Sequence, residues 1–331
     1  MTQQDQTTFS QKRAMRLDVQ WVERPTFPRE VYFDICSACN HSCVFCANVK
    51  MADKMLLDKN LAYRLIDECA ANGTQDIGFH ATGEPFMHKH LASFVERAKK
   101  AGIKYVFIST NGALATPERA KPVLDAGLDS VKFSVNAGTR ESYKAVHGRD
   151  DFDAVIGHIK WFHRYREESG RHFGIYFSMV PTLQTKDEWP ILADLLAPYT
   201  DDNNLRGCSN QGGNMYENNA TQEVDKDNLL GSLSHAHHGG KCPDPFFRCV
   251  VTPQGFLSAC VVDYQNFLCV ADLHDSTIAE AWTSPAFVEL RRRHLGGDLK
   301  GLICHNCLHN CNEPAAPLTA EFARPFLVTA K

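Results

Sequence analysis

Short apolar runs alternate with longer amphipathic segments over the first two thirds of the chain. The runs are rich in β-branched and aromatic residues, which is typical of strands, and the longer segments repeat their apolar positions at helical spacing. The predicted strands cover residues 31–35, 76–80, 105–110, 130–135, 173–180 and 203–208. The predicted helices between them cover residues 60–72, 89–101, 117–126, 152–168 and 187–197.

Six strand–helix repeats predict an α/β fold with a parallel sheet, because parallel neighbours need a crossover connection. Six units are too few to close an eight-stranded barrel, so we expect a partial (β/α)6 barrel of parallel strands. Folds of this kind place their chemistry at the carboxyl ends of the strands. The loops that follow the predicted strands are therefore the expected position of a site.

The last third of the chain has a different character. Residues 209–241 are polar and contain glycine, so we expect them to bridge two units. A second, smaller unit holds seven of the thirteen cysteines and begins with a predicted hairpin around Gly255, whose strands lie at 249–251 and 256–262. A helix at 278–293 follows it. The predicted boundaries are 1–30 (N-terminal extension), 31–208 (barrel), 209–241 (bridge), 242–313 (second unit) and 314–331 (tail without predicted structure).

Composition narrows the function classes. The chain has 331 residues, a net charge of −4 and no basic run, which argues against nucleic-acid binding through a phosphate-neutralising patch. No apolar stretch reaches the ~18 residues of a membrane span, and the polar N-terminus lacks the order of a signal peptide. We therefore expect a cytoplasmic protein that acts on neither nucleic acid nor membrane. In that setting thirteen cysteines favour metal ligation over disulfides.

Three cysteines follow the first predicted strand at C-x3-C-x2-C spacing: Cys39, Cys43 and Cys46. Three thiolates on one tight loop can hold three irons of a [4Fe–4S] cluster and leave the fourth iron with an open coordination site. The alternative is a structural zinc knuckle, which needs four ligands. Cys36 or His41 could supply the fourth ligand, so zinc remains open at this point.

This motif, with Phe45 before its last cysteine, resembles that of the radical S-adenosylmethionine (SAM) superfamily. The resemblance implies that the open iron binds the amino and carboxylate groups of SAM. It also implies that reductive cleavage gives a 5′-deoxyadenosyl radical, which removes a hydrogen atom from an unactivated carbon. It further implies an electron donor such as flavodoxin or ferredoxin.

Loops after the later strands carry the same resemblance. Thr82-Gly83-Glu84-Pro85 follows the second strand and is similar to the family's Gly-Gly-Glu-Pro loop, which implies backbone carbonyls and the Glu84 carboxylate as acceptors for the methionine ammonium. Further expected SAM-binding residues lie at or near the ends of the third, fourth and fifth strands: Ser109, Asn111, Ser134 and Met179. The partner of the methionine carboxylate stays unassigned among Arg149, Lys132 and Arg140.

The second cysteine group resembles the C-terminal auxiliary-cluster extension called SPASM, or its shortened twitch form. The resemblance implies that one auxiliary [4Fe–4S] cluster is held by Cys242, Cys260, Cys304 and Cys307. A four-cysteine zinc site has similar spacing and remains an alternative. Two auxiliary clusters would need Cys249, Cys269 and Cys311 together with a further ligand.

Short relatives with one auxiliary cluster act on sugars and aminoglycosides in antibiotic biosynthesis, and this small-molecule class is the favoured one. Within it we expect redox-neutral epimerisation, in which the Cys249 thiol on the hairpin donates a hydrogen atom to the substrate radical. A dehydrogenase that oxidises a carbinol to a ketone through the auxiliary cluster is the first alternative, and a peptide- or protein-modifying maturase is the second. A non-enzymatic metal scaffold would explain the cysteines but not the loops at successive strand ends.

Overall fold

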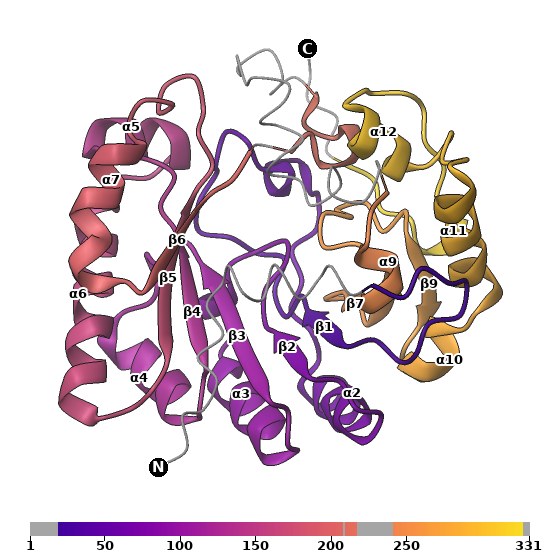
Figure 1. Cartoon of the computed structure of the whole chain (residues 1–331), viewed down its shortest axis with the longest axis horizontal. Coiled ribbons are helices and arrows are strands. Elements are labelled where there is room, and N and C mark those ends of the chain that lie inside the picture. The colour runs from indigo at the N-terminus through magenta and orange to yellow at the C-terminus, as the bar shows by residue number, and fades with distance from the viewer. Residues whose placement is uncertain (1–18, 208, 217–240, 327–331) are drawn as a thin grey trace.

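The computed structural model describes residues 19–207, 209–216 and 241–326. Within these ranges one sheet of nine strands has the order β6-β5-β4-β3-β2-β1-β7-β8-β9 (Figure 1). The strands are β1 (Glu30–Phe33), β2 (Asp76–Gly78), β3 (Tyr105–Thr110), β4 (Ser130–Ser134), β5 (Gly174–Met179), β6 (Asp202–Leu205), β7 (Arg248–Val251), β8 (Phe256–Ser258) and β9 (Cys269–Asp272). Strands β1 to β6 pair in parallel, which confirms the predicted partial barrel.

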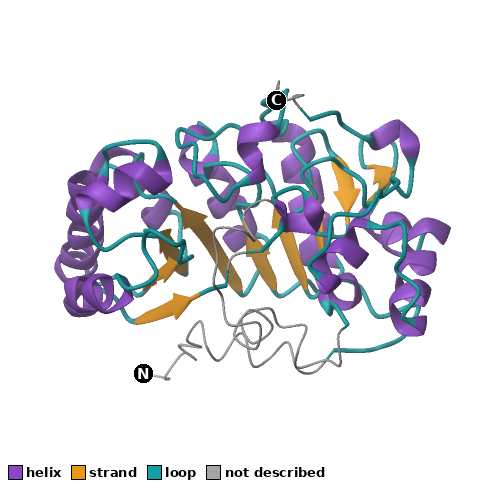
Figure 2. Cartoon of the chain, turned by 90° about the horizontal axis from the view of Figure 1, so that it is seen from above, coloured by secondary structure: helices purple, strands orange, loops and turns teal. Residues whose placement is uncertain are grey.

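Helices lie along the outer side of this curved layer (Figure 2). The helices of the barrel are α2 (Lys59–Ala71), α3 (Leu91–Lys100), α4 (Pro117–Asp125), α5 (Arg140–His147), α6 (Phe152–Ser169) and α7 (Trp189–Leu196). The second unit adds α9 (Asp244–Phe247), α10 (Ile278–Trp282), α11 (Pro285–Gly296) and α12 (Ile303–His309). Short 3-10 turns cover Ala47–Lys50, Pro85–Met87, Ala197–Tyr199, Gln211–Gly213 and Ala320–Phe322.

Two of these helices differ from the sequence prediction. Helix α5 was not predicted, because its eight residues are too short to show a clear apolar period. The predicted helix at 278–293 is two helices, since Ser284 caps a new helix that has Pro285 in its first turn. The end of the sixth predicted strand, Cys208, lies outside the described residues, as do most of the predicted bridge and the ends of the terminal segments.

The barrel sheet separates a helix-covered core from an interior cavity. On β1, Val31 and Phe33 are fully buried in the apolar core against the helices, whereas Glu30 and Tyr32 line a cavity on the other face. Successive side chains of a strand point to opposite faces of the sheet, so the same strand places one pair of residues in the core and the other pair in the cavity. The cavity thus runs along the inner face of the sheet, from Glu30 and Tyr105 at the amino ends of their strands to Ser109 and Ser134 near the carboxyl ends.

The second unit continues the barrel sheet. Strand β7 pairs in parallel with β1, with Glu30 opposite Arg248, and β8 returns antiparallel to β7. The turn between them uses Gly255 at φ 85°, a conformation that favours glycine. Figure 1 shows the orange and yellow C-terminal part beside the purple barrel strands.

A buried charge cluster joins the two units at this strand pair. Arg248 is 5% exposed, and its guanidinium donates to the Glu30 carboxylate at 3.0 Å, to the Tyr32 hydroxyl at 3.1 Å and to the Asp244 carboxylate. Both acids are themselves buried. Each charge that is removed from water in this way needs a partner of opposite charge, because an unpaired buried charge lowers the free energy of unfolding.

The tail also differs from its prediction. Its described part, 314–326, lies against both units: the Leu318 amide donates to the Phe267 carbonyl at 2.8 Å, and the Arg324 side chain donates to the Asp53 carbonyl at 2.7 Å. These contacts are with segments far away in the sequence, so no local pattern predicts them.

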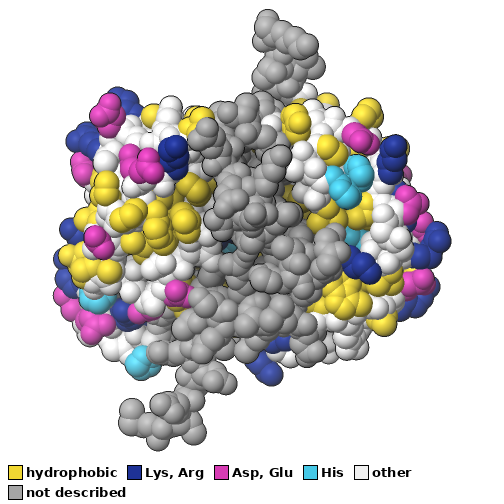
Figure 3. Space-filling view, turned by 45° about the horizontal axis from the view of Figure 1, so that its top comes forward, with side chains coloured by type: hydrophobic (Ala, Val, Ile, Leu, Met, Phe, Trp, Pro, Cys, Tyr) yellow, Lys and Arg dark blue, Asp and Glu magenta, His cyan; other side chains and the backbone are white. Residues whose placement is uncertain are grey.

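The surface in Figure 3 carries charged side chains mainly at its outer margins, with hydrophobic side chains closer to the middle. No helix in the described ranges is long and apolar enough to cross a membrane.

The charge cluster gives a stability prediction. Replacing Arg248 by Ala leaves two buried carboxylates without their cation, so the free energy of unfolding should fall by about 3–5 kcal/mol. Chemical denaturation of the anaerobic protein would measure this change. Arg292→Ala, which removes an exposed partner of Glu289, serves as the control and should leave the unfolding midpoint unchanged.

Candidate functional site

The strand ends and the second unit enclose one cavity of about 380 Å³. Strands β1, β3, β4, β5 and β7 contribute side chains from their inner faces, and α12 and the segment after β8 contribute the opposite wall. The lining includes Tyr32, His80, Phe107, Ser109, Lys132, Ser134, Tyr176, Arg206, Arg248, Cys242, Cys260, Tyr264, Cys304 and Cys307.

The three cysteines of the first motif lie on the loop that follows β1, and all three are partly exposed. Two other segments hold the backbone of this loop. The Ser42 and Val44 amides donate to the carbonyls of His147 and Val146 in the last turn of α5, at 3.1 and 3.0 Å. The loop is thereby fixed to the barrel side of the cavity.

Gln211 holds the loop from the bridging segment. Its side-chain oxygen accepts from the Ala47 amide at 2.9 Å, and its amide nitrogen donates to the Phe45 carbonyl at 2.7 Å. The backbone of Phe45 is therefore fixed on the side of the second unit. The sequence analysis missed Gln211, since a polar residue in a glycine-containing loop gives no signal of a long-range contact.

Neither candidate for a fourth zinc ligand completes a site with the three cysteines. The Cys36 thiol is buried and donates to the Ala38 carbonyl at 3.3 Å. The ring nitrogens of His41 contact Asp151 at 3.0 Å and His147 at 3.2 Å. Three cysteines on one loop therefore fit a [4Fe–4S] cluster with one open iron.

The loop after β2 packs directly on the cysteine loop. A Cβ atom at Gly83 would overlap the carbonyl oxygens of Cys36 and Ala38, so glycine is required by this close approach. Thr82 is held from both sides: its amide and hydroxyl donate to the Asp34 carboxylate, and its carbonyl accepts from the Asn48 amide at 2.6 Å. Burial raises the pKa of Asp34 to about 7.

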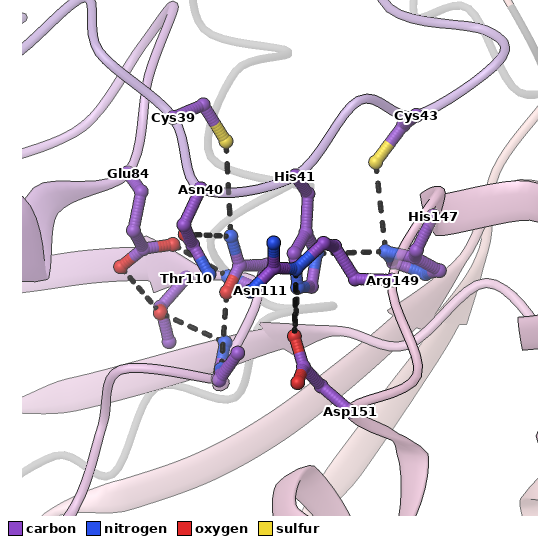
Figure 4. Close-up of polar contacts among 12 residues, drawn as sticks. Cys39, Asn40, His41, Cys43, Glu84, Thr110, Asn111, His147, Arg149 and Asp151 are labelled. Atoms are coloured by element: carbon purple, nitrogen blue, oxygen red, sulfur yellow. Dashed lines mark hydrogen bonds and ion pairs between the residues drawn. The ribbon is translucent and has the colours of Figure 1, made fainter. Parts of the chain in front are cut away.

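Glu84 is 2% exposed, and its carboxylate is occupied by neighbouring donors. It accepts from the Thr110 hydroxyl at 2.7 Å, the Asn111 amide at 2.8 Å and the Phe86 amide at 3.0 Å. Burial raises the pKa of Glu84 to about 7. The carboxylate that was expected to receive the methionine ammonium thus fixes the loop after β3 to the loop after β2 (Figure 4).

The other expected SAM-binding residues fall into two groups. Ser109 and Ser134 line the cavity, and Asn111 lies beside the cysteine loop, with its amide nitrogen 2.9 Å from the Asn40 side-chain oxygen. Met179 is fully buried in the apolar core and is absent from the cavity lining.

Of the three candidate partners for the methionine carboxylate, Lys132 lines the cavity, on the same face of β4 as Ser134. Arg140 and Arg149 are exposed and lie beside surface carboxylates.

The four cysteines of the second group come together in the cavity wall. Cys304 and Cys307 lie on α12, while Cys242 and Cys260 come from before α9 and after β8. Burial, followed by the charges of the other three and of Asp244, raises the pKa of Cys242 well above its ordinary value. Thiols that oppose ionisation in this way are stabilised as thiolates when metal binds.

Cys249 does not lie in the cavity. It is fully buried in the apolar core, and its neighbours include Cys69 on α2 and Arg291 on α11. Its neighbour Arg248 occupies the inner face of β7, so Cys249 takes the outer face. The hydrogen-donor role assigned to Cys249 from the sequence therefore lacks the position that it requires.

The cysteines proposed for a second auxiliary cluster lie in separate surroundings. Cys269 is fully buried on β9 near Asp263, and the Cys311 thiol donates to the Asn306 side-chain oxygen at 3.2 Å. With Cys249 on the outer face of β7, these three do not form one ligand set.

Lys132 was predicted at the site from the sequence, but the cavity holds two further cations, Arg206 and Arg248, that were not. The cations Lys132, Arg206 and Arg248 all act on His80, whose pKa is lowered well below its ordinary value by burial first and by these charges second. The His80 ring, just after β2, is therefore buried and neutral. The available signal was the position of His80 and Arg206 directly at the ends of strands.

Comparison with known families agrees with this geometry. The sequence matches the radical SAM superfamily over residues 34–196 and the iron–sulfur cluster-binding domain SPASM over residues 242–308. The chain carries a radical SAM domain followed by a SPASM domain. These domains imply SAM, a SAM-binding [4Fe–4S] cluster and an auxiliary iron–sulfur cluster.

Curated relatives share the radical SAM region. A "tungsten-containing aldehyde ferredoxin oxidoreductase cofactor-modifying protein" of Pyrococcus furiosus is 30% identical over 50% of this chain and 47% of its own length. A "probable GTP 3′,8-cyclase" of Saccharolobus solfataricus is 34% identical over 37% of this chain and 40% of its own. An "Fe-coproporphyrin III synthase" of Methanosarcina barkeri is 32% identical over 50% and 40%. The chain thus spans half or less of the length of these relatives.

Solved structures share the fold over most of the chain. BtrN in complex with AdoMet and 2-DOIA is 18% identical, with a TM-score of 0.58 over 92% of this chain and 100% of that chain. SuiB of Streptococcus suis bound to precursor peptide SuiA is 15% identical, with a TM-score of 0.65 over 85% of this chain and 70% of that chain. At these identities the likeness shows the radical SAM and SPASM fold and leaves the substrate open.

The contact of Gly83 with the cysteine loop gives a second prediction. Gly83→Ala forces the loop after β2 away from Cys36 and Ala38, so the reconstituted protein should hold less iron and form 5′-deoxyadenosine at least about tenfold more slowly. Iron analysis and anaerobic chromatography would measure both quantities.

Gly157→Ala is the matched control for this variant. Gly157 lies in α6, and an added Cβ there meets nothing within 4 Å. Iron content and rate should be unchanged in the control. Normal values in Gly83→Ala would show that the close approach is unimportant for the site.

Proposed function

We propose that this protein oxidises a carbinol of a small, anionic, sugar-type substrate to a ketone. The observation that carries the proposal is the shared cavity. The expected SAM-binding residues Ser109 and Ser134 and the four cysteines of the SPASM domain all line it. A substrate in this space lies between the position of hydrogen-atom removal and the position of the auxiliary cluster.

When bound, SAM and its reduced cluster would supply the removal of one hydrogen atom from the carbinol carbon, and the auxiliary cluster would supply an acceptor for the remaining electron. The proton of the hydroxyl group must leave as well. His80 Nδ1, which is buried without a hydrogen-bond partner among the described residues, can accept a hydrogen bond from this hydroxyl group. Burial and the nearby cations lower the pKa of His80, so the ring stays neutral and the proton is released to solvent. The carbinol then loses one hydrogen atom, one proton and one electron, which balances ketone formation.

The charges of the cavity support an anionic substrate. Three cations, Lys132, Arg206 and Arg248, lie in its described lining. We assign Lys132 to the methionine carboxylate and Arg206 to a carboxylate or phosphate of the substrate, because cationic side chains form charge-assisted hydrogen bonds with such groups. A polycationic aminoglycoside suits this surface poorly. The names of two relatives, a GTP cyclase and an Fe-coproporphyrin synthase, refer to anionic molecules and agree with this class.

Epimerisation, which the sequence favoured, is the less supported outcome. It needs a hydrogen-atom donor that faces the substrate, and Cys249 lies on the outer face of β7. The cysteines among the described cavity residues are the four of the SPASM domain. Oxidation needs these four as cluster ligands and needs nothing from Cys249.

Anaerobic turnover with a panel of phosphorylated, carboxylated, neutral and amino sugars tests the reaction. We expect 5′-deoxyadenosine together with a product two mass units lighter than one of the anionic sugars. In deuterium oxide, a product one mass unit heavier than the substrate, with one deuterium at carbon, would instead show epimerisation. Turnover of a peptide only would contradict the small-molecule class.

Two variants sharpen this prediction. Cys304→Ala should still form 5′-deoxyadenosine but should lose the oxidised product, because its auxiliary ligand set is incomplete. Cys249→Ala should still form both 5′-deoxyadenosine and the oxidised product. Loss of product in Cys249→Ala with normal cofactor cleavage would restore the thiol role.

Arg206 provides a prediction about substrate charge. Arg206→Gln should raise the KM for the anionic substrate by about tenfold or more, since a charge-assisted hydrogen bond is lost. The KM for a neutral analogue should stay the same, and kcat should change little. An equal effect on both substrates would contradict a direct contact of Arg206 with the anionic group.

A further inference from the structure

Each cysteine of the radical SAM motif contacts one side-chain donor from a different part of the fold. The Asn111 amide nitrogen lies 3.7 Å from the Cys39 sulfur, His147 Nδ1 lies 3.5 Å from the Cys43 sulfur, and the Tyr264 hydroxyl lies 3.5 Å from the Cys46 sulfur. Figure 4 shows the first two of these contacts. We call Asn111, His147 and Tyr264 the donor set.

The hydrogen bonds around His147 determine which of its ring nitrogens carries the proton. The Asn136 side-chain oxygen accepts from the Val180 amide at 2.8 Å, so its amide nitrogen must face His147 Nε2, 3.3 Å away. An amide nitrogen is a donor, so Nε2 is the acceptor and the ring proton lies on Nδ1. Nδ1 is the atom that faces Cys43.

The neighbouring histidine agrees with this assignment. His41 Nε2 lies 3.0 Å from the Asp151 carboxylate and donates to it, so His41 Nδ1 is an acceptor. His147 Nδ1 lies 3.2 Å from this acceptor and 3.5 Å from the Cys43 sulfur, so its proton is shared between the two.

Packing holds the His147 ring in this orientation. The ring is fully buried and stacks on Tyr143, with centroids 4.0 Å apart and an angle of 13° between the planes. A donor fixed in this way loses little entropy when it bonds to the sulfur.

Tyr264 brings a donor from the SPASM domain. Its side chain is 6% exposed, and its hydroxyl lies 3.5 Å from the Cys46 sulfur. A thiolate that ligates iron has no proton to give, so Tyr264 donates and Cys46 accepts.

We propose that the donor set acts as a group of positioning residues that bond to the three ligating sulfurs and raise the reduction potential of the SAM-binding cluster. Reduction adds negative charge to the cluster, and a hydrogen bond to a ligand sulfur stabilises the charged state. The inference rests on a cluster at Cys39, Cys43 and Cys46 and is independent of the substrate and of the oxidation proposed above.

Redox titration of the reconstituted full-length protein without SAM, followed by electron paramagnetic resonance, tests the proposal. Tyr264→Phe removes one hydroxyl and His147→Phe removes the ring donor while keeping an aromatic ring against Tyr143. Both should shift the midpoint potential of the SAM-binding cluster to more negative values, and the double variant should shift it further. Cys304→Ala can be used as the common background, since it removes the overlapping auxiliary signal.

Two controls separate this role from a structural one. His147→Asn places an amide nitrogen near the position of Nδ1, so it should restore most of the potential. Tyr165→Phe removes a hydroxyl that bonds to Asp125 on α4, away from the cysteine loop, and should leave the potential unchanged.

Unchanged potentials in Tyr264→Phe and His147→Phe at full iron content would overturn the proposal. A second overturning result concerns zinc, because the ligand atoms of His41, Cys43 and His147 lie close enough together to hold a metal ion. One zinc per chain in the native protein, lost in His147→Phe, would show that His147 is a metal ligand and not a donor to the cluster.

Discussion

The parallel pairing of β7 with β1 is the constraint on which the site depends. It attaches the SPASM domain to the first strand of the barrel, and the cysteine loop begins directly after that same strand. The positions of both cysteine groups are therefore set relative to the same strand, β1. The distance between the two groups depends on the geometry of the sheet. The buried ion cluster of Arg248, Glu30 and Asp244 favours this register, because a shifted β7 would leave buried charges without partners.

Most strands and helices of the barrel were predictable, because the spacing of apolar positions and the residues typical of turns are properties of short stretches of sequence. The strand order follows from the crossover rule, and the cysteine groups follow from ligand spacing. Which side chains of β7 point towards the cavity could not be predicted in this way. All four of its residues are buried, so the strand shows no alternation of polar and apolar positions, and only the register with β1 places Arg248 inward and Cys249 outward.

Helix α5 shows the same limit at the site. It is short and was missed, yet its last turn accepts the backbone of the cysteine loop and its final residue, His147, faces Cys43. Glu84 was found from its motif, but its hydrogen bonds to Thr110 and Asn111 could not be predicted, since these donors lie far from it in the sequence. The spacing of cysteines in the sequence thus identifies candidate metal ligands. It gives little information about the side chains that surround those ligands.

The surroundings of the cysteine loop come from the barrel, the bridge and the SPASM domain. Helix α5 and Asn111 contact it from the barrel, Gln211 contacts it from the bridge, and Tyr264 contacts it from beyond β8. A cluster whose ligands receive hydrogen bonds from both domains has a potential that depends on their docking. Reduction of the cluster would then be most favourable in the fully assembled fold, where the cavity between the two cysteine groups is also complete.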